Sequence, residues 1–267
     1  MDTKPKIGLI GAGVMGEALI SALITYGINP DLITISEKRL DRVNELTSKY
    51  SIKSSELAGN VSAAQVLLLA VKPQDLAAVL EEIKTHIHSQ TLVITFAAGK
   101  SISSVTNVIG QSNPVIRVMP NSPILLGVGM SAISISDNVT KEHRDFVMGF
   151  LGAAGKTIEV DESLQDAVTA TSGSGPAYFF AFVEAMVVGA MDLGLNEKDA
   201  TTLTVQTIIG AATMLEQSGQ TAAVLRENVT SPNGTTAAAL TSFTNDGFEQ
   251  LVVRAMKAAR DRAQELA

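Results

Sequence analysis

Three glycines near the N-terminus could hold the phosphates of a nucleotide. The segment Gly11-Ala12-Gly13-Val14-Met15-Gly16 fits the pattern G-x-G-x-x-G and follows an apolar run, Lys6–Ile10, typical of a buried strand. In such a turn the first glycine permits a tight bend, the second lets the backbone approach a pyrophosphate, and the third packs a helix on the strand. Backbone N–H groups at the helix start then bind the phosphates. The cofactor-binding residues predicted here are Ile10, Gly11, Ala12, Gly13, Val14 and Met15.

The residues after the second predicted strand bear on which dinucleotide binds. In sites of this kind an acid about 20 residues beyond the turn holds the ribose 2′-hydroxyl of NAD, and Glu37 qualifies. Glu37 is flanked, however, by the hydroxyl of Ser36 and by the cations of Lys38 and Arg39, which could hold the 2′-phosphate of NADP. The two cations also fit a solvated helix start. Ser36 and Lys38 are predicted cofactor contacts, and the choice between NAD and NADP stays open.

Small residues also follow two later predicted strands, 66–71 and 91–96. Ligands of open α/β sheets bind outside the carboxyl ends of the strands, so a nicotinamide ribose could approach there. An ordinary turn with a surface lysine explains the same residues. The predicted contacts are Ala70, Val71, Lys72 and Pro73 after the first strand and Ala97, Ala98 and Gly99 after the second.

Two loops in the second half of the chain could receive a carboxylate. Thr171–Tyr178 and Val229–Thr236 both place hydroxyl residues, glycine and proline before a predicted helix. The first N–H groups of a helix have no intrahelical partner and carry partial positive charge. Capped helix starts account for the same residues, because Ser and Thr are preferred caps.

The composition excludes several other kinds of chemistry. The chain has no Cys, which removes disulfides, cysteine-ligated metals and thiol nucleophiles. His86 and His88 stand two positions apart and do not share a helical face, so we expect no metal site. A net charge of −7, 4% aromatic residues and no Trp are unfavourable for binding nucleic acid.

No export signal or membrane span is expected. The start of the chain is polar and lacks the ordered basic, apolar and small-residue regions of a signal peptide. The longest apolar stretch, Ala177–Met191, contains Glu184 and is shorter than the ~20 residues that cross a bilayer. We expect a cytoplasmic protein.

The first part of the chain alternates between strand-like and helix-like segments, which predicts a doubly wound α/β layer. A length of 267 residues suggests about two domains. Residues 1–160 are therefore predicted to form a Rossmann-like dinucleotide-binding domain. The predicted strands are 6–10, 32–35, 66–71, 91–96, 115–119, 128–135 and one ending near 160; the helices are 14–26, 40–50, 75–83, one near 102, and 140–151.

Residues 161–267 are predicted to form an all-helical domain. They hold 6 basic and 13 acidic residues, so the whole net charge of −7 falls there and residues 1–160 are neutral. Several helices are apolar nearly all round, as in Tyr178–Val183, and must be covered by other protein. We expect an obligate helical dimer, with Glu184 paired or at its interface. The predicted helices are 164–171, 176–193, 197–217, 221–227, 234–243 and 248–266.

Taken together, these segments resemble the Δ1-pyrroline-5-carboxylate reductase family, whose members catalyse the last step of proline synthesis. The resemblance runs the whole length of the chain, and Val229–Thr236 is its most specific part. The other matching segments are Gly11–Met15, Ala70–Gln74, Arg117–Pro123 and Ser172–Tyr178.

The resemblance implies an N-terminal dinucleotide domain and a C-terminal helical domain that intertwines with a partner's in a homodimer, which allows assembly into larger rings. The substrate would bind between the cofactor and the loop Ser231–Thr236. By similarity, N–H groups around Gly234, Thr235 and Thr236 would bind the substrate carboxylate, the Thr236 hydroxyl would hydrogen-bond the ring nitrogen, and Asn228 would lie close to the nicotinamide.

The resemblance bears on the cofactor as well. NADPH is the usual donor in the family, and some members accept NADH. Many relatives carry Asn-Arg where this chain has Ser36-Glu37, so the preference stays open. The family loop usually reads Ser-Pro-Gly-Gly, whereas Asn233 replaces the first of these glycines; Asn tolerates the left-handed backbone that the turn needs.

The implied reaction transfers a hydride from C4 of the nicotinamide to the imine carbon, which becomes C5 of L-proline. A protonated imine is already electrophilic, so no buried acid or base is required. Orienting the two reactants supplies on the order of 7–11 kcal/mol, and Thr236 would position the ring. One alternative is an enzyme of the β-hydroxyacid dehydrogenase type, which uses a Lys in the first long helix of its second domain; residues 176–193 contain none. Another is a non-catalytic dinucleotide sensor.

Overall fold

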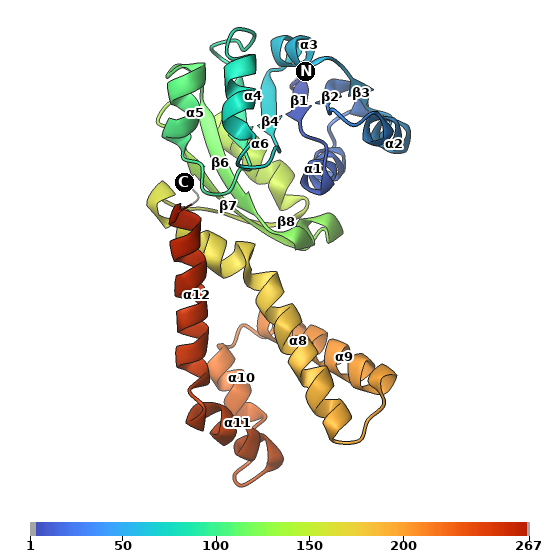
Figure 1. The fold of residues 1–267 in the computed structure, drawn as a ribbon, viewed down its shortest axis with the longest axis vertical. Coiled ribbons are helices and arrows are strands. Elements are labelled where there is room, and N and C mark those ends of the chain that lie inside the picture. The colour runs from blue at the N-terminus through green and yellow to red at the C-terminus, as the bar shows by residue number, and fades with distance from the viewer. Residues whose placement is uncertain (1–3, 266–267) are drawn as a thin grey trace. The chain divides into compact units, whose positions relative to one another are not determined.

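The computed structural model describes residues 4–265, which form two compact units (Figure 1). The first unit contains residues 4–174 together with 259–265, and the second contains residues 175–258. The units therefore divide after Ser174, and the predicted domain boundary between residues 160 and 161 stays a prediction.

The first unit is built on one sheet of eight strands in the order β3-β2-β1-β4-β5-β6-β7-β8. Neighbouring strands are parallel except β6 and β7, which are antiparallel. A parallel partner requires a long crossover, and only a short 3₁₀ segment joins β6 to β7. The strands are β1 Ile7–Ile10, β2 Ile33–Ser36, β3 Lys53–Ser54, β4 Val66–Leu69, β5 Leu92–Thr95, β6 Val115–Pro120, β7 Gly129–Ile135 and β8 Gly155–Glu159.

Helices cover both faces of this sheet, because the central strands are apolar on both sides. In β4, Val66 and Leu68 pack into one cluster with α1, α2 and α6, while Leu67 and Leu69 pack into the other with α3, α4 and α5. The doubly wound layer predicted from the sequence is therefore confirmed. The helices are α1 Val14–Thr25, α2 Leu40–Tyr50, α3 Leu57–Ala63, α4 Leu76–Ile83, α5 Ile102–Ile109 and α6 Lys141–Gly152.

The structure differs from the prediction in two segments. The short strand β3 and the helix α3 were not predicted, because neither shows a clear apolar period. The predicted helix 164–171 is instead the short helix α7, Gln165–Val168, followed by a π-helical turn, Thr169–Gly173. In this turn the N–H of Ser174 donates to the carbonyl of Thr169 at 2.8 Å. Side-chain hydroxyls in the turn also bond to carbonyls four residues earlier, a pattern that bends helices.

The second unit is helical, as predicted. Asn196 caps α9 as expected, accepting a hydrogen bond from the N–H of Asp199 at 3.0 Å. Phe182, Phe243 and Phe248 form a small aromatic cluster, with neighbouring ring centroids 6.5 and 5.4 Å apart. The helices are α8 Gly175–Asp192, α9 Glu197–Gln217, α10 Ala222–Asn228, α11 Thr235–Asn245 and α12 Phe248–Glu265, whose last residues belong to the first unit.

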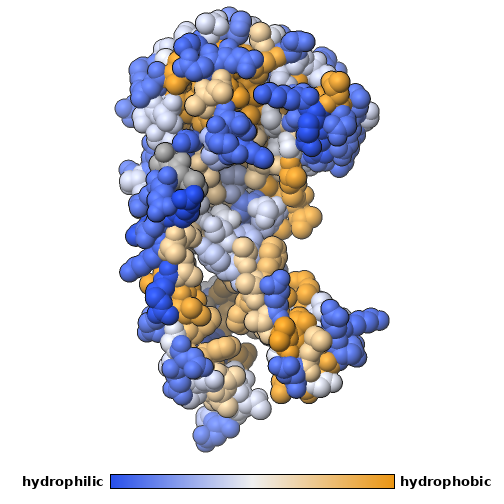
Figure 2. All heavy atoms as spheres, viewed as in Figure 1, coloured by the Kyte–Doolittle hydropathy of each residue, from blue (hydrophilic) through white to orange (hydrophobic). Residues whose placement is uncertain are grey.

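Much of the apolar surface of α8 is exposed in the single chain. Phe179 and Phe180 are 62% and 65% exposed, and Glu184 on the same helix is exposed too. Hydrophobic residues lie at the surface of the second unit in the space-filling view (Figure 2). Residues 162–192 are also long and apolar enough to cross a membrane by length and composition, a criterion that helices of soluble proteins meet too. Several large apolar side chains exposed on one helix are typical of a surface that another protein covers.

Candidate functional site

Each glycine of the turn after β1 has its own structural reason. Gly11 has φ +88°, and a Cβ there would lie 2.8 Å from the carbonyl oxygen of Ala70. A Cβ on Gly16 would collide with the carbonyl oxygen of Gly11. Gly13 has open space where a Cβ would stand, and it starts α1 without a side-chain cap. The free space and the uncapped N–H groups fit the approach of a pyrophosphate.

The other predicted cofactor residues also lie at the carboxyl ends of the parallel strands. The N–H of Gly11 donates to the carbonyl of Ser36 at 3.1 Å, and the N–H of Ala70 donates to that of Ile10 at 2.9 Å. These bonds join the carboxyl ends of β1, β2 and β4, and β5 lies next to β4. The structure therefore brings together the turn, Ser36, Lys38 and the segments 70–73 and 97–99. Val14, Lys38 and Lys72 are exposed there, whereas Ala12 and Ala97 are buried.

Glu37 points from the end of β2 into the glycine turn. Its carboxylate accepts hydrogen bonds from the N–H of Ala12 at 2.9 Å and from the N–H of Arg39 at 3.1 Å. Burial raises the pKa of Glu37, but these two hydrogen bonds and the charge of Arg39 outweigh it, so the pKa lies below its ordinary value. The carboxylate is thus charged and held in place at neutral pH.

A partly buried ion network supports the turn from α1 and α2, and no sequence motif indicated it. The guanidinium of Arg42 donates from Nε to the carbonyl of Ala12 at 2.9 Å and forms an ion pair with Glu17. Hydrogen bonds from Lys49 at 2.8 Å and from Arg42 are the main reasons that the pKa of Glu17 falls from 4.5 to about 2. Tyr50 donates a further hydrogen bond at 3.1 Å. Arg42 is therefore occupied in holding the backbone of the turn.

A second support comes from α3. The side chain of Asn60 is buried and donates to the hydroxyl of Ser36 at 2.9 Å. That hydroxyl in turn donates to the carbonyl of Ser55 at 2.9 Å. Ser36 therefore already uses its single proton inside the protein.

Two segments that carried part of the resemblance, Arg117–Pro123 and the start of Ser172–Tyr178 at Ser172, meet at the carboxyl end of β6. Asn121 joins them, because its amide donates to the carbonyl of Ser172 at 3.1 Å and accepts from the N–H of Met130 at 2.8 Å. A cavity of about 350 Å³ opens beside this junction. Its lining includes Val14 and Met15 of the glycine turn together with Pro120, Asn121, Ser122 and Gly173. Asn121 and its neighbours were not among the predicted site residues, although their motif was recognised.

The predicted substrate loop lies in the second unit and opens α11. The N–H of Gly234 donates to the carbonyl of Ser231 at 3.0 Å, and Asn233 has φ +56°. With Pro232 before it, this is the pattern of a type II turn, and Asn233 adopts the left-handed backbone expected of it. A Cβ on Gly234 would collide with the hydroxyl of Ser231.

Thr235 and Thr236 are the first residues of α11, after Gly234 as an N-cap without a side-chain bond. Their N–H groups have no intrahelical partner and can bind an anion. The Thr236 side chain is half-buried. Asn228 is exposed at the last position of α10, where its amide donates to the side chain of Gln220 at 3.4 Å. The predicted cofactor residues and substrate residues thus belong to different units, apart from Asn228, which lies with the substrate residues.

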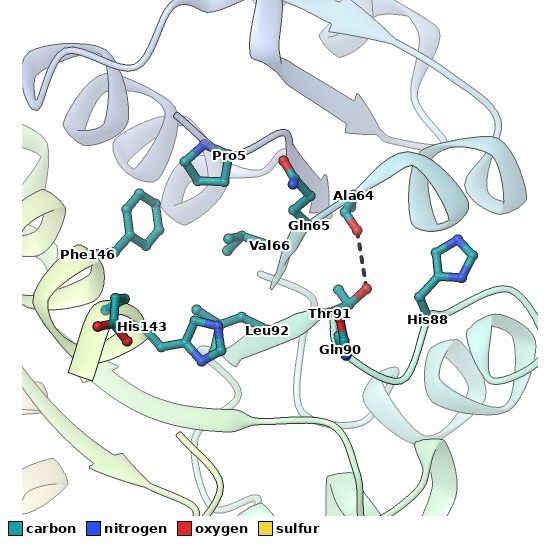
Figure 3. A pocket seen from close by; sticks show the side chains of 11 residues that line it. Pro5, Ala64, Gln65, Val66, His88, Gln90, Thr91, Leu92, His143 and Phe146 are labelled. Carbon is teal, nitrogen blue, oxygen red and sulfur yellow. Dashed lines mark hydrogen bonds between the residues drawn. The ribbon is translucent and has the colours of Figure 1, made fainter. Parts of the chain in front are cut away.

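A second cavity, of about 440 Å³, lies at the amino ends of the strands, beside the first residues of β4 and β5 (Figure 3). Its lining includes His88, which contacts the carbonyl of Ser62 at 3.1 Å, and His143, which is half-buried and closes the capping box of α6. Within residues 4–265 no group of three or more His, Asp or Glu side chains is placed to hold a metal.

Comparison with known proteins covers the whole chain. Residues 162–266 match the family described as pyrroline-5-carboxylate reductase dimerisation, and residues 6–99 match that described as NADP oxidoreductase, coenzyme F420-dependent. A pyrroline-5-carboxylate reductase of Pseudomonas aeruginosa is 40% identical over 99% of this chain and 98% of that protein. This chain belongs to the pyrroline-5-carboxylate reductase family.

Solved structures agree with the family assignment. A pyrroline-5-carboxylate reductase from Coxiella burnetii has a TM-score of 0.93 at 32% identity and covers 99% of both chains. A pyrroline carboxylate reductase from Plasmodium falciparum with NADP bound has a TM-score of 0.87 at 28% identity and covers 98% of both chains.

Family membership accounts for the exposed apolar surface of the second unit. The exposed apolar helices of the second unit lie in the region that matches the reductase dimerisation family, which supports oligomerisation of this chain. The fold predicted from the sequence, a Rossmann-like sheet followed by a helical dimerisation domain, is confirmed. The dehydrogenase alternative is not favoured, since α8 contains no Lys.

Proposed function

We propose that this chain reduces 1-pyrroline-5-carboxylate to L-proline with a nicotinamide dinucleotide as the hydride donor. The observation that carries the proposal is the end-to-end match to curated pyrroline-5-carboxylate reductases, at 40% identity for the Pseudomonas aeruginosa enzyme. The match includes both the dinucleotide turn and the turn that opens α11.

Residues of the first unit would bind the cofactor, and residues of the second unit would bind the substrate. The uncapped start of α1 binds the pyrophosphate, and the small residues after β4 and β5 leave room for the nicotinamide ribose. When bound, NAD(P)H would supply the hydride that is transferred to the imine carbon. NADPH is the usual donor by resemblance and NADH is the alternative; the residues after β2 bear on that choice.

At the second unit, the turn Ser231–Gly234 would present the start of α11 to the substrate. The N–H groups of Thr235 and Thr236, with that of Gly234, bind the carboxylate, and the Thr236 hydroxyl orients the ring nitrogen. Asn228 would lie close to the nicotinamide. The imine would bind in its protonated form, so that hydride addition yields the amine directly and no side chain needs to supply the proton. Orienting the two rings would then account for much of the rate.

The active form would be an intertwined homodimer in the cytoplasm, and larger rings of such dimers are compatible with it. What supports the dimer is the exposed apolar surface of α8 within the region that matches the dimerisation family. A protein with several exposed phenylalanines on one helix is not expected to persist as a monomer.

The test is a pair of rate measurements with the purified full-length protein. Oxidation of NADPH and of NADH is followed at 340 nm with and without pyrroline-5-carboxylate, and the proline formed is quantified. Imine-dependent oxidation with one proline per dinucleotide supports the proposal. Binding of dinucleotide without any imine-dependent oxidation would instead support the sensor alternative.

A further inference from the structure

Glu37 occupies the position where Rossmann-like sites distinguish the two nicotinamide dinucleotides. It is the first residue after β2, and the ribose that carries the 2′-hydroxyl or 2′-phosphate binds beside that strand end. Its carboxylate contacts the N–H of Ala12, the second residue of the glycine turn, at 2.9 Å. The carboxylate therefore faces the dinucleotide side of β2.

The carboxylate is fixed and keeps capacity for a ligand. Its side chain is only 13% exposed, and each oxygen accepts one backbone hydrogen bond, from Ala12 and from Arg39. An ionised carboxylate has about four acceptor positions, so two remain for ribose hydroxyls. Because these bonds also hold the pKa of Glu37 low, the negative charge persists throughout the neutral range.

The groups that could bind a 2′-phosphate are mostly committed elsewhere. Arg42 is 12% exposed and bonds to the carbonyl of Ala12 and to Glu17. The hydroxyl of Ser36 donates to the carbonyl of Ser55. Arg39 is 58% exposed, and its Nε lies 3.5 Å from the Glu37 carboxylate, which already neutralises part of its charge. Lys38 is the remaining cation of this loop; among the described residues it is exposed and forms no such hydrogen bond or ion pair.

We propose that Glu37 makes this enzyme prefer NADH, by accepting hydrogen bonds from the ribose hydroxyls and by repelling the 2′-phosphate of NADPH. This inference rests on the proposed function and names its cofactor. A 2′-phosphate would bring nearly two negative charges against a fixed carboxylate, with one free lysine to offset them.

The test measures binding directly, by titrating the full-length wild-type enzyme with NADH and with NADPH and following nicotinamide fluorescence or heat. The wild type is expected to bind NADH at least about tenfold more tightly. ADP-ribose and 2′-phospho-ADP-ribose, which lack the nicotinamide, should show the same ratio. A wild type that binds NADPH as tightly as NADH overturns the proposal without any variant.

Variants test whether Glu37 causes the preference for NADH. Glu37→Gln keeps an oxygen for the N–H of Ala12 and removes the charge, so it should shrink the ratio of the two affinities by about tenfold, mainly through tighter NADPH binding. The control Asp41→Asn removes an equally charged but exposed side chain of α2 and should leave the ratio unchanged. If Glu37→Gln weakens both dinucleotides equally, Glu37 merely supports the turn and the proposal fails.

A third variant tests the opposite possibility. Lys38→Ala with Arg39→Ala should change the two affinities similarly; a selective loss of NADPH binding would show that these cations hold the 2′-phosphate, and would contradict the proposal. None of these titrations requires the imine. A protein that prefers NADH but does not reduce pyrroline-5-carboxylate would therefore refute the proposed function and leave this inference standing.

Discussion

The ion network beneath the glycine turn makes a quantitative prediction about acid stability. Replacing Glu17 by Gln removes the carboxylate that pairs with Arg42 and Lys49. Arg42 is 12% exposed and would lose its partly buried partner, while its bonds to the backbone of the turn would remain. We expect a large loss of stability at neutral pH and a small one in acid.

The magnitude follows from the pKa of Glu17, which the network lowers from 4.5 to about 2. A lowered pKa means that the carboxylate contributes its full stabilisation above pH 4.5 and loses it as the pH falls towards 2. The shift corresponds to about 3 kcal/mol at pH 7, an upper value because Lys49 is exposed and its share is screened. At pH 3 about 1 kcal/mol of this remains.

The assay is urea denaturation of the wild type and Glu17→Gln at pH 7, 5, 4 and 3, at one fixed protein concentration because assembly adds to stability. The difference in the free energy of unfolding should fall from about 3 to about 1 kcal/mol across this range. The control Glu45→Gln alters the exposed partner of Arg42 and should cost below about 1 kcal/mol at every pH. A difference for Glu17→Gln that does not change with pH would refute the linkage argument.

Three further outcomes are expected. Gly16→Ala should destabilise the protein by about 1–3 kcal/mol in urea denaturation, because its Cβ meets backbone that cannot move aside; Gly152→Ala, with open space at the end of α6, should cost nothing. Phe180→Glu should shift the mass by light scattering towards the 28.0 kDa monomer, and an unchanged mass would place the interface elsewhere. Thr236→Val should lower kcat/KM at least about tenfold while leaving the cofactor affinity unchanged. The control Thr241→Val, whose hydroxyl donates to the carbonyl of Ala237 within α11, should change neither quantity. Full imine reduction by Thr236→Val would exclude the positioning role of Thr236.

The parts of the fold that the sequence predicted well are those with strong periodic signals. Leu40–Tyr50 and Glu197–Gln217 were predicted with the bounds that the structure gives α2 and α9. The unbroken apolar run from Val66 predicted a strand buried on both faces, which β4 is. Short elements with mixed patterns, such as α3, could not be predicted, because seven residues contain too few turns to show a period.

The candidate site was predicted unevenly for a similar reason. The glycines of the turn are dictated by local geometry, so their spacing alone revealed them. The partners that hold the turn are far away in sequence: Arg42 reaches the carbonyl of Ala12 across 30 positions, and Asn121 reaches Ser172 across 51. Such bonds leave no pattern in a single sequence.

By itself, the sequence determined the layered fold, the dinucleotide turn and the family, because each of these depends on residue types at short and regular spacing. It named Glu37 as one of several candidates for the ribose contact but could not choose among them. Our proposal for Glu37 depends on the tertiary structure, which shows that the Ser36 hydroxyl donates within the protein and that the Glu37 carboxylate accepts from the N–H of Ala12 in the turn. Which side chains near the turn are already hydrogen-bonded depends on distances between residues far apart in the sequence, and only the folded structure shows these distances.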